Sequence, residues 1–157
     1  ASLTDDNLLR HHQKYGKPII ISTGMSEMKQ IEHAVEVLGS DNLIILHSTS
    51  TYPAQLEELN LKMIHTLKEK FPVPIGYSGH EVGLSPSYAA IVLGASVVER
   101  HITISRAEWG SDQAASIEPQ GLKRLVDDIR AFEIAIGDGV KKVYESEVPI
   151  IEKLRRK

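Results

Sequence analysis

The sequence predicts an α/β fold in which four βα units build one parallel sheet, about half of a (β/α)8 barrel. Short apolar runs begin near positions 18, 42, 74 and 96, and segments of helical length separate them. Runs that are apolar throughout are typical of strands buried on both faces, as in parallel sheets. Eight such units close a barrel over about 250 residues. The 157 residues therefore cannot close such a barrel alone.

The first part of the chain alternates helix and strand twice. We expect a capped helix over 5–15 and a buried strand over 18–22. Ser26 is the expected cap of the next helix, which ends at Gly39 and is followed by a strand over 42–47.

The second part repeats this alternation. Prolines at 72 and 74 are expected to end a helix that starts near Leu59, and Pro119 is a favourable first residue for the last helix. The expected elements are a helix over 59–71, a strand over 75–78, a helix over 86–93, a strand over 96–100, a polar loop over 104–118 and a helix over 119–136.

Composition excludes several classes of protein. Eighteen basic and 21 acidic residues give a net charge of −3, without the basic stripe of a nucleic-acid binder. The chain has no cysteine, so disulfides and thiolate ligands are excluded. No apolar run reaches the length of a membrane span and the amino terminus does not read as a signal peptide, so we expect no membrane partner and a cytoplasmic location. The missing initial Met and the abrupt end in EKLRRK suggest part of a longer protein.

Two histidines lie just beyond the ends of neighbouring predicted strands. His80 and His101 should lie at the same sheet edge, where parallel α/β folds bind ligands, close enough to share one ion. Two imidazoles with open positions suit Mn, Fe, Co or Zn. The alternative is that each is an ordinary core or surface histidine, the interpretation that we favour for His11, His12, His33 and His65.

Other polar residues gather at the same predicted edge. His47 could be a core residue or a partner of the site, and Glu81 and Glu99 could accept hydrogen bonds from the two histidines. Asp112 in the polar loop could bind a sugar hydroxyl or a metal-bound water, or simply form an Asx turn. The serines at the strand ends could bind phosphate oxygens, or cap turns and helices.

Five motifs carry a family resemblance. Their order is GKPIIISTGMS, HSTSTYPA, IGYSGHEVG, VVERHIT and GSDQAASIEP. In this order and spacing they closely resemble the sialic acid synthases, the phosphoenolpyruvate-dependent N-acetylneuraminate synthases. The resemblance implies a (β/α)8 TIM barrel of which 1–145 is about the second half. It also implies that 146–157 starts a linker to an antifreeze-like domain, which a homodimer partner contributes to the active site.

The resemblance also implies the chemistry. A divalent ion, most often Mn²⁺, is held by His80 and His101 and polarises the aldehyde of an N-acetylmannosamine-type sugar. The methylene carbon of phosphoenolpyruvate attacks this aldehyde, water adds, and phosphate leaves by carbon–oxygen cleavage. By the same match Ser22, Ser50 and Ser78, with Ser2 as a weaker candidate, contact phosphoenolpyruvate, and Tyr52 and Asp112 bind the sugar.

The resemblance places further groups outside this sequence. A glutamate and two phosphate-binding lysines should precede Ala1, and an arginine should follow Lys157, so we expect the isolated segment to be inactive. Some members carry Asn at position 50. Two alternatives remain: a non-catalytic half-barrel for binding or assembly, and a metal-dependent aldolase or 3-deoxy sugar acid synthase with another acceptor.

Overall fold

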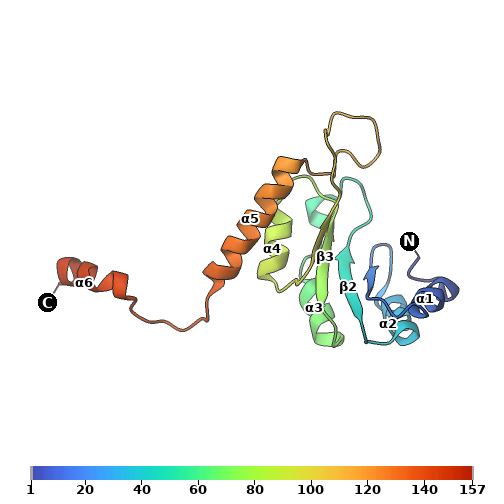
Figure 1. Cartoon of the computed structure of the whole chain (residues 1–157), viewed down its shortest axis with the longest axis horizontal. Helices are drawn as coiled ribbons and strands as arrows, with labels where there is room; N and C mark the ends of the chain where they lie inside the picture. Colours follow the sequence, from blue (N-terminus) through green and yellow to red (C-terminus); the bar gives the residue numbers. More distant parts are fainter. Residues whose placement is uncertain (1, 157) are drawn as a thin grey trace.

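The computed structural model describes residues 2–156 and contains one four-stranded parallel sheet (Figure 1). Its strands are β1 (Ile19–Ser22), β2 (Leu43–Ser48), β3 (Ile75–Gly79) and β4 (Val98–Arg100), and they lie in the order β1-β2-β3-β4. Each strand is hydrogen-bonded in parallel to its neighbour in the sequence. Successive parallel strands in sequence order are the arrangement of a (β/α)8 barrel, so the predicted half-barrel is confirmed.

Helices cover one face of this sheet and form the core with it. Buried strand residues such as Ile45 and Tyr77 belong to one hydrophobic cluster with Ile64 and Leu67 of α3 (Met63–Lys70). The opposite face is open: Ile20, on the other side of β1, is 52% exposed. Because side chains alternate along a strand, alternate residues of each strand share this open face, which is the interior face of a barrel.

The first two helices show how local hydrogen bonds set the ends. The Asp5 carboxylate accepts a hydrogen bond from the Leu8 amide at 3.0 Å and starts α1 (Asp6–Gln13). The prediction that Ser26 caps α2 (Met28–Leu38) is wrong: Glu27 is the cap and forms a capping box with Gln30. The Ser26 hydroxyl bonds to the Gly24 carbonyl instead.

The predicted helix over 59–71 is shorter in the structure. A 3-10 helix, η1 (Leu56–Glu58), precedes it, and Asn60 has a φ of 41°, which an α-helix does not allow. The α-helix therefore begins only at Met63. The later predictions agree well with α4 (Ser85–Val92) and α5 (Pro119–Ile136).

The carboxyl-terminal segment leaves the sheet and its helices. After α5, an extended stretch leads to η2 (Glu145–Glu147) and α6 (Val148–Leu154), which lie apart from the rest of the chain (Figure 1). Helix α6 was not among the elements expected from the sequence, and the assignment of 146–157 to a linker stays a prediction. Within residues 2–156, no helix combines the length and apolar character needed to cross a bilayer.

Candidate functional site at the carboxyl edge of the sheet

Strand pairing brings the two predicted histidines together. Gly79 of β3 is paired with Arg100 of β4, so the next residues, His80 and His101, leave neighbouring strands side by side. Their ring centroids are 5.2 Å apart and the rings lie edge to face. The predicted neighbourhood is therefore present, with a ring separation at which two imidazoles could share one ion.

A backbone carbonyl fixes the orientation of His80. Its Nδ1 lies 2.7 Å from the Thr49 carbonyl oxygen, and the Ser48 hydroxyl is 3.4 Å from the same nitrogen. A carbonyl can only accept, so Nδ1 carries the proton and donates it. The neutral ring then has its lone pair on Nε2. Metal-binding histidines generally use one nitrogen for the ion and donate the other N–H in this way.

His101 is held more loosely, beside Asp112. The Nδ1 of His101 is 3.7 Å from Oδ2 of Asp112, an ion-pair distance but longer than a hydrogen bond. The Ser111 hydroxyl donates to the other oxygen, Oδ1, at 2.7 Å. The predicted sugar-binding carboxylate therefore lies beside the second histidine.

Tyr52 contacts both histidines. Its ring centroid is 4.2 Å from that of His80 and 5.4 Å from that of His101. Partial burial raises the pKa of Tyr52, and the negative charges of Asp112 and Glu99 raise it further. The phenol therefore stays protonated, and the aromatic ring, the two imidazoles and Asp112 form one group.

The chemistry of these donors fits a borderline divalent ion. No group of three or more His, Cys, Asp or Glu side chains that could hold a metal occurs in residues 2–156. The two imidazoles of His80 and His101 are the nitrogen donors that lie together at this edge, and water or substrate oxygens could fill the other positions around an ion. Such a set suits the metals named above better than Mg²⁺ or Ca²⁺, which prefer oxygen ligands.

Ser78 lies below this group on the open face of the sheet. It is 2% exposed, and its hydroxyl donates to Oε1 of Glu99 at 2.8 Å. Glu99 is paired with Ser78 in the sheet, so both side chains point to the barrel interior. Within the described residues the donor to Glu99 is Ser78 and not a histidine, so the expected hydrogen bond from a histidine is not present.

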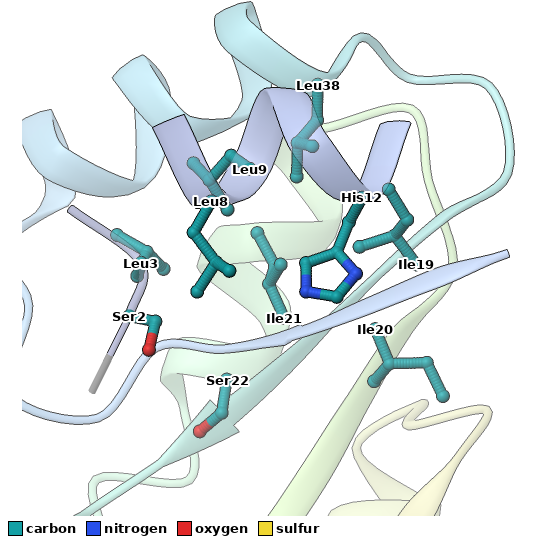
Figure 2. A pocket seen from close by; sticks show the side chains of 10 residues that line it. All are labelled: Ser2, Leu3, Leu8, Leu9, His12, Ile19, Ile20, Ile21, Ser22 and Leu38. Atoms are coloured by element: carbon teal, nitrogen blue, oxygen red, sulfur yellow. The ribbon is translucent and has the colours of Figure 1, made fainter. Parts of the chain in front are cut away.

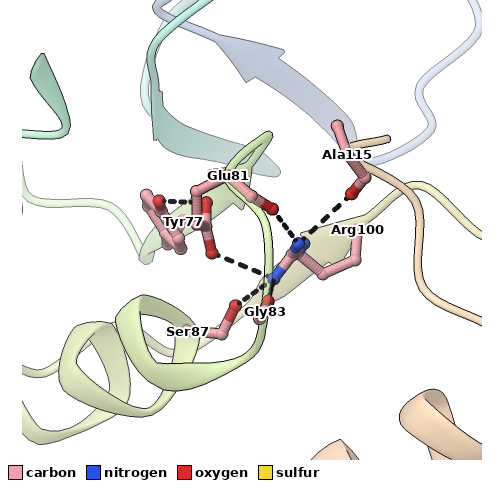
Figure 3. Close-up of polar contacts among 6 residues, drawn as sticks. All are labelled: Tyr77, Glu81, Gly83, Ser87, Arg100 and Ala115. Carbon is pink, nitrogen blue, oxygen red and sulfur yellow. Dashed lines mark hydrogen bonds and ion pairs between the residues drawn. The ribbon is translucent and has the colours of Figure 1, made fainter. Parts of the chain in front are cut away.

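Glu81 also has other partners than the histidines (Figure 3). Oε2 accepts a hydrogen bond from the Tyr77 hydroxyl at 2.8 Å, and Oε1 accepts one from Arg100 at 2.9 Å. Burial and the adjacent Glu81 carboxylate raise the pKa of Tyr77. Sequence reasoning missed Arg100. A signal was available in the sequence: Glu81 and Arg100 carry opposite charges, and each is adjacent to one of the two candidate histidines.

The other two predicted serines lie nearer β1. Ser50 lines a cavity of about 710 Å³ with Ser48 and Thr51. A Cβ on Gly24 would lie 1.9 Å from the Ser50 hydroxyl, so only glycine allows this close approach. Ser48 connects the cavity to His80.

Ser22 and Ser2 are among the residues that line a separate cavity of about 250 Å³ beside α1 and β1, most of whose lining is apolar. The Ser22 side chain lies with that of Ile20 on the side of β1 away from Leu8 and Leu9 of α1 (Figure 2). The whole of β2 separates Ser22 from the strands that carry the histidines. The structure therefore does not bring Ser22 into the group around His80 and His101.

His47 belongs to the core. It is buried and its Nε2 lies 2.7 Å from the Leu59 carbonyl oxygen. Burial lowers the pKa of His47 below its usual value, although this backbone contact opposes the shift. The core interpretation of His47 is thus the one that the structure supports.

Comparisons with known proteins agree with this architecture. The NeuB family profile matches residues 1–141. The chain is 42% identical to an N,N'-diacetyllegionaminic acid synthase of Campylobacter jejuni over 99% of its length, and 45% identical to the human N-acetylneuraminate-9-phosphate synthase over 90%. It covers 48% and 40% of these two proteins, so it spans about half the length of the curated relatives that it matches.

Solved structures show the same likeness. A sialic acid synthetase from Leptospira borgpetersenii, crystallised with citrate, superposes with a TM-score of 0.86 at 33% identity, covering 99% of this chain and 56% of that one. A truncated 3-deoxy-D-arabino-heptulosonate 7-phosphate synthase from Thermotoga maritima shares the fold, with a TM-score of 0.73 over 89% of this chain and 58% of that one, at 20% identity. The family match and the identities to the curated relatives establish that this chain belongs to the NeuB family.

Proposed function

We propose that this chain is part of the catalytic barrel of a synthase that condenses phosphoenolpyruvate with an N-acetylmannosamine-type sugar, giving a sialic acid or related nonulosonic acid and phosphate. The observation that carries the proposal is the group of His80, His101, Tyr52 and Asp112 at the carboxyl edge of the sheet in a NeuB-family chain. Several relatives are named as synthases of such acids.

His80 and His101 are the proposed ligands of a divalent ion, with Mn²⁺ as our first choice. The bound ion would supply Lewis acidity for the aldehyde of the sugar. The chain's contribution is orientation: the Thr49 carbonyl holds the Nδ1 proton of His80, so that Nε2 presents its lone pair. Asp112 lies beside Nδ1 of His101 and favours a proton on that nitrogen, which leaves the lone pair of His101 on Nε2 as well.

Tyr52 and Asp112 are the proposed sugar-binding residues. The exposed ring of Tyr52 can pack against the sugar, and the half-exposed carboxylate of Asp112 can accept its hydroxyl groups. Both lie against the two histidines, so a sugar held by them would have its aldehyde near the proposed ion. This arrangement supports an open-chain amino sugar as acceptor.

The serine hydroxyls are the proposed contacts of phosphoenolpyruvate. Ser78 is the best supported of them, because it lies on the interior face of the sheet, paired with Glu99 and directly below the histidines. Ser50 lines the neighbouring cavity, and Ser22 would contribute only if the substrate reached β1. In the proposed reaction the methylene carbon of phosphoenolpyruvate bonds to the aldehyde carbon, water adds to the former enol carbon, and phosphate leaves with its bridging oxygen.

The test is phosphate release from phosphoenolpyruvate in the presence of N-acetylmannosamine. The full-length protein should release phosphate only when Mn²⁺ and the sugar are both present, and the isolated 157 residues should release none. A panel of legionaminic- and pseudaminic-type precursors would identify the acceptor. Gel filtration of the full-length protein tests the proposed homodimer. Phosphate release that does not depend on the metal or on any of the sugars tested would contradict the proposal.

A further inference from the structure

A buried ion pair lies next to both histidines in the sequence and below them in the fold. Glu81 follows His80, and Arg100 precedes His101. The Glu81 side chain is 0% exposed and the Arg100 side chain 2% exposed, and their charged groups are 2.9 Å apart. Because neighbouring residues of a strand point to opposite faces, this pair lies on the helix-covered side and does not itself reach the imidazoles.

Arg100 connects three segments of the site through its guanidinium group (Figure 3). Nη2 donates to the carbonyl oxygens of Glu81 at 2.7 Å and Ala115 at 3.3 Å. Nη1 donates to Oε1 of Glu81, to the Gly83 carbonyl at 2.8 Å and to the Ser87 hydroxyl at 3.0 Å. One side chain thus joins β4 to the loop after β3, to the first turn of α4 and to the loop that carries Asp112.

The surroundings leave the pair little freedom to move. A Cβ on Gly79 would lie 2.8 Å from Oε2 of Glu81, 2.8 Å from the Tyr77 ring and 3.1 Å from Cδ of Arg100. The Tyr77 hydroxyl holds the second carboxylate oxygen. Glycine at 79 therefore lets the end of β3 pass directly over the ion pair, one residue before His80.

Net stability is a poor explanation for this pair. Taking two charges out of water costs several kcal/mol per ion, and this cost can exceed the attraction that is gained. The Nε of Arg100 is also buried without a hydrogen-bond partner in the described part of the chain, which adds to the cost. What the pair does provide is a fixed distance between three stretches of backbone, at residues 80–83, at 100 and at 115.

We propose that the Glu81–Arg100 pair positions His80 and His101 for metal binding. It acts through the backbone: each partner is one residue from one histidine, so the guanidinium sets the separation and direction of the two imidazoles. Neither Glu81 nor Arg100 is a ligand. This inference rests on the proposed metal site and adds to it the residues that hold the ligands in place.

The test measures Mn²⁺ affinity of the full-length protein without substrates, by the electron paramagnetic resonance signal of free Mn²⁺. Arg100→Lys keeps the charge but not the fork that reaches several acceptors. Tyr77→Phe is a milder change that removes only the hydroxyl bonded to Glu81. Tyr88→Phe is the control, because its hydroxyl bonds to Asp128 at 2.6 Å, between α4 and α5 and away from the pair.

We expect Arg100→Lys to weaken Mn²⁺ binding about 10- to 100-fold, the range typical of groups that orient metal ligands. Tyr77→Phe should weaken Mn²⁺ binding by a smaller factor. Tyr88→Phe should leave Mn²⁺ binding unchanged, even if it lowers the melting temperature as much as Tyr77→Phe does. Normal affinity in both Tyr77→Phe and Arg100→Lys, with a lowered melting temperature, would show that the pair is merely structural. No Mn²⁺ binding by the unmodified protein would instead refute the metal site, and this inference with it.

Discussion

The two sides of the candidate site are built differently. At β3 and β4, two histidines lie above a fully buried ion pair whose hydrogen bonds reach the backbone of the two loops that follow these strands. At β1 and β2, the predicted contacts are half-buried serine hydroxyls, and residues 2–156 place no buried charge below them. A metal needs its ligands within a few tenths of an ångström, whereas a hydroxyl can rotate to meet its partner. The difference suggests that rigidity is concentrated where the metal is proposed.

The largest effect is expected from breaking the ion pair outright. Arg100→Leu leaves the Glu81 charge buried and unpaired, which should lower the free energy of unfolding by about 3–5 kcal/mol. Urea titration of the full-length protein measures this. Lys123→Ala is the control, because its pair with Asp127 is exposed and contributes about 0.3–0.5 kcal/mol. If Arg100→Leu lowers the free energy of unfolding no more than Lys123→Ala does, the idea that the buried pair holds β3 and β4 rigidly is contradicted.

Removing a ligand should affect function more than stability. His80→Asn is expected to weaken Mn²⁺ binding and Mn²⁺-dependent phosphate release by more than the roughly 10- to 100-fold typical of orienting groups, because a proposed ligand itself is lost. Isothermal titration with Mn²⁺ and a phosphate assay measure the two quantities. His65→Asn serves as control, since His65 is an exposed helix residue paired with Glu69. Equal metal affinity in both variants would rule out His80 as a ligand.

The serines allow the two sides to be compared directly. Ser78→Ala removes one hydroxyl from the interior face, and we expect the KM for phosphoenolpyruvate to rise about 2- to 10-fold, the range for one hydrogen bond. Ser22→Ala should change it less, because β2 lies between Ser22 and the histidine strands. Steady-state kinetics in full-length protein measure both. A larger effect at Ser22 would mean that phosphoenolpyruvate lies nearer β1 than we propose.

The smallest effect concerns pH and His47. Burial lowers the pKa of His47 in the folded protein, so the unfolded chain takes up a proton more readily. The stability that the folded protein gains from keeping His47 uncharged is complete when the pH is above about 6.5, the usual pKa of histidine. It is lost as the pH falls below that value, because the unfolded chain then binds the proton more readily. Melting temperatures between pH 7.5 and pH 5 should therefore fall less steeply in His47→Gln than in the unmodified protein. His65→Gln is the exposed control, and identical slopes in all three proteins would contradict the assignment.

Sequence patterns predicted the strands and their order because periodicity is a local property. The continuous apolar runs identified all four strands, and the ends of β3 and β4 placed His80 and His101 together. Helix starts were harder. Ser26 and Glu27 are both able to cap α2, and only the backbone geometry selects Glu27. The start of α3 depended on the left-handed conformation of Asn60, which its sequence context did not reveal.

The amino-acid sequence by itself determined the parallel α/β class, the family motifs and the pairing of two histidines at one edge. Only the tertiary structure decided the partners: Thr49 for His80, Ser78 for Glu99, and Arg100 for Glu81. The physical reason is that strand alternation and strand order follow from short-range patterns, whereas a buried charge selects its partner among groups that are distant in the chain. Tyr77, Glu81, Arg100 and Ala115 meet only after β3, β4 and the loops that follow them have packed together.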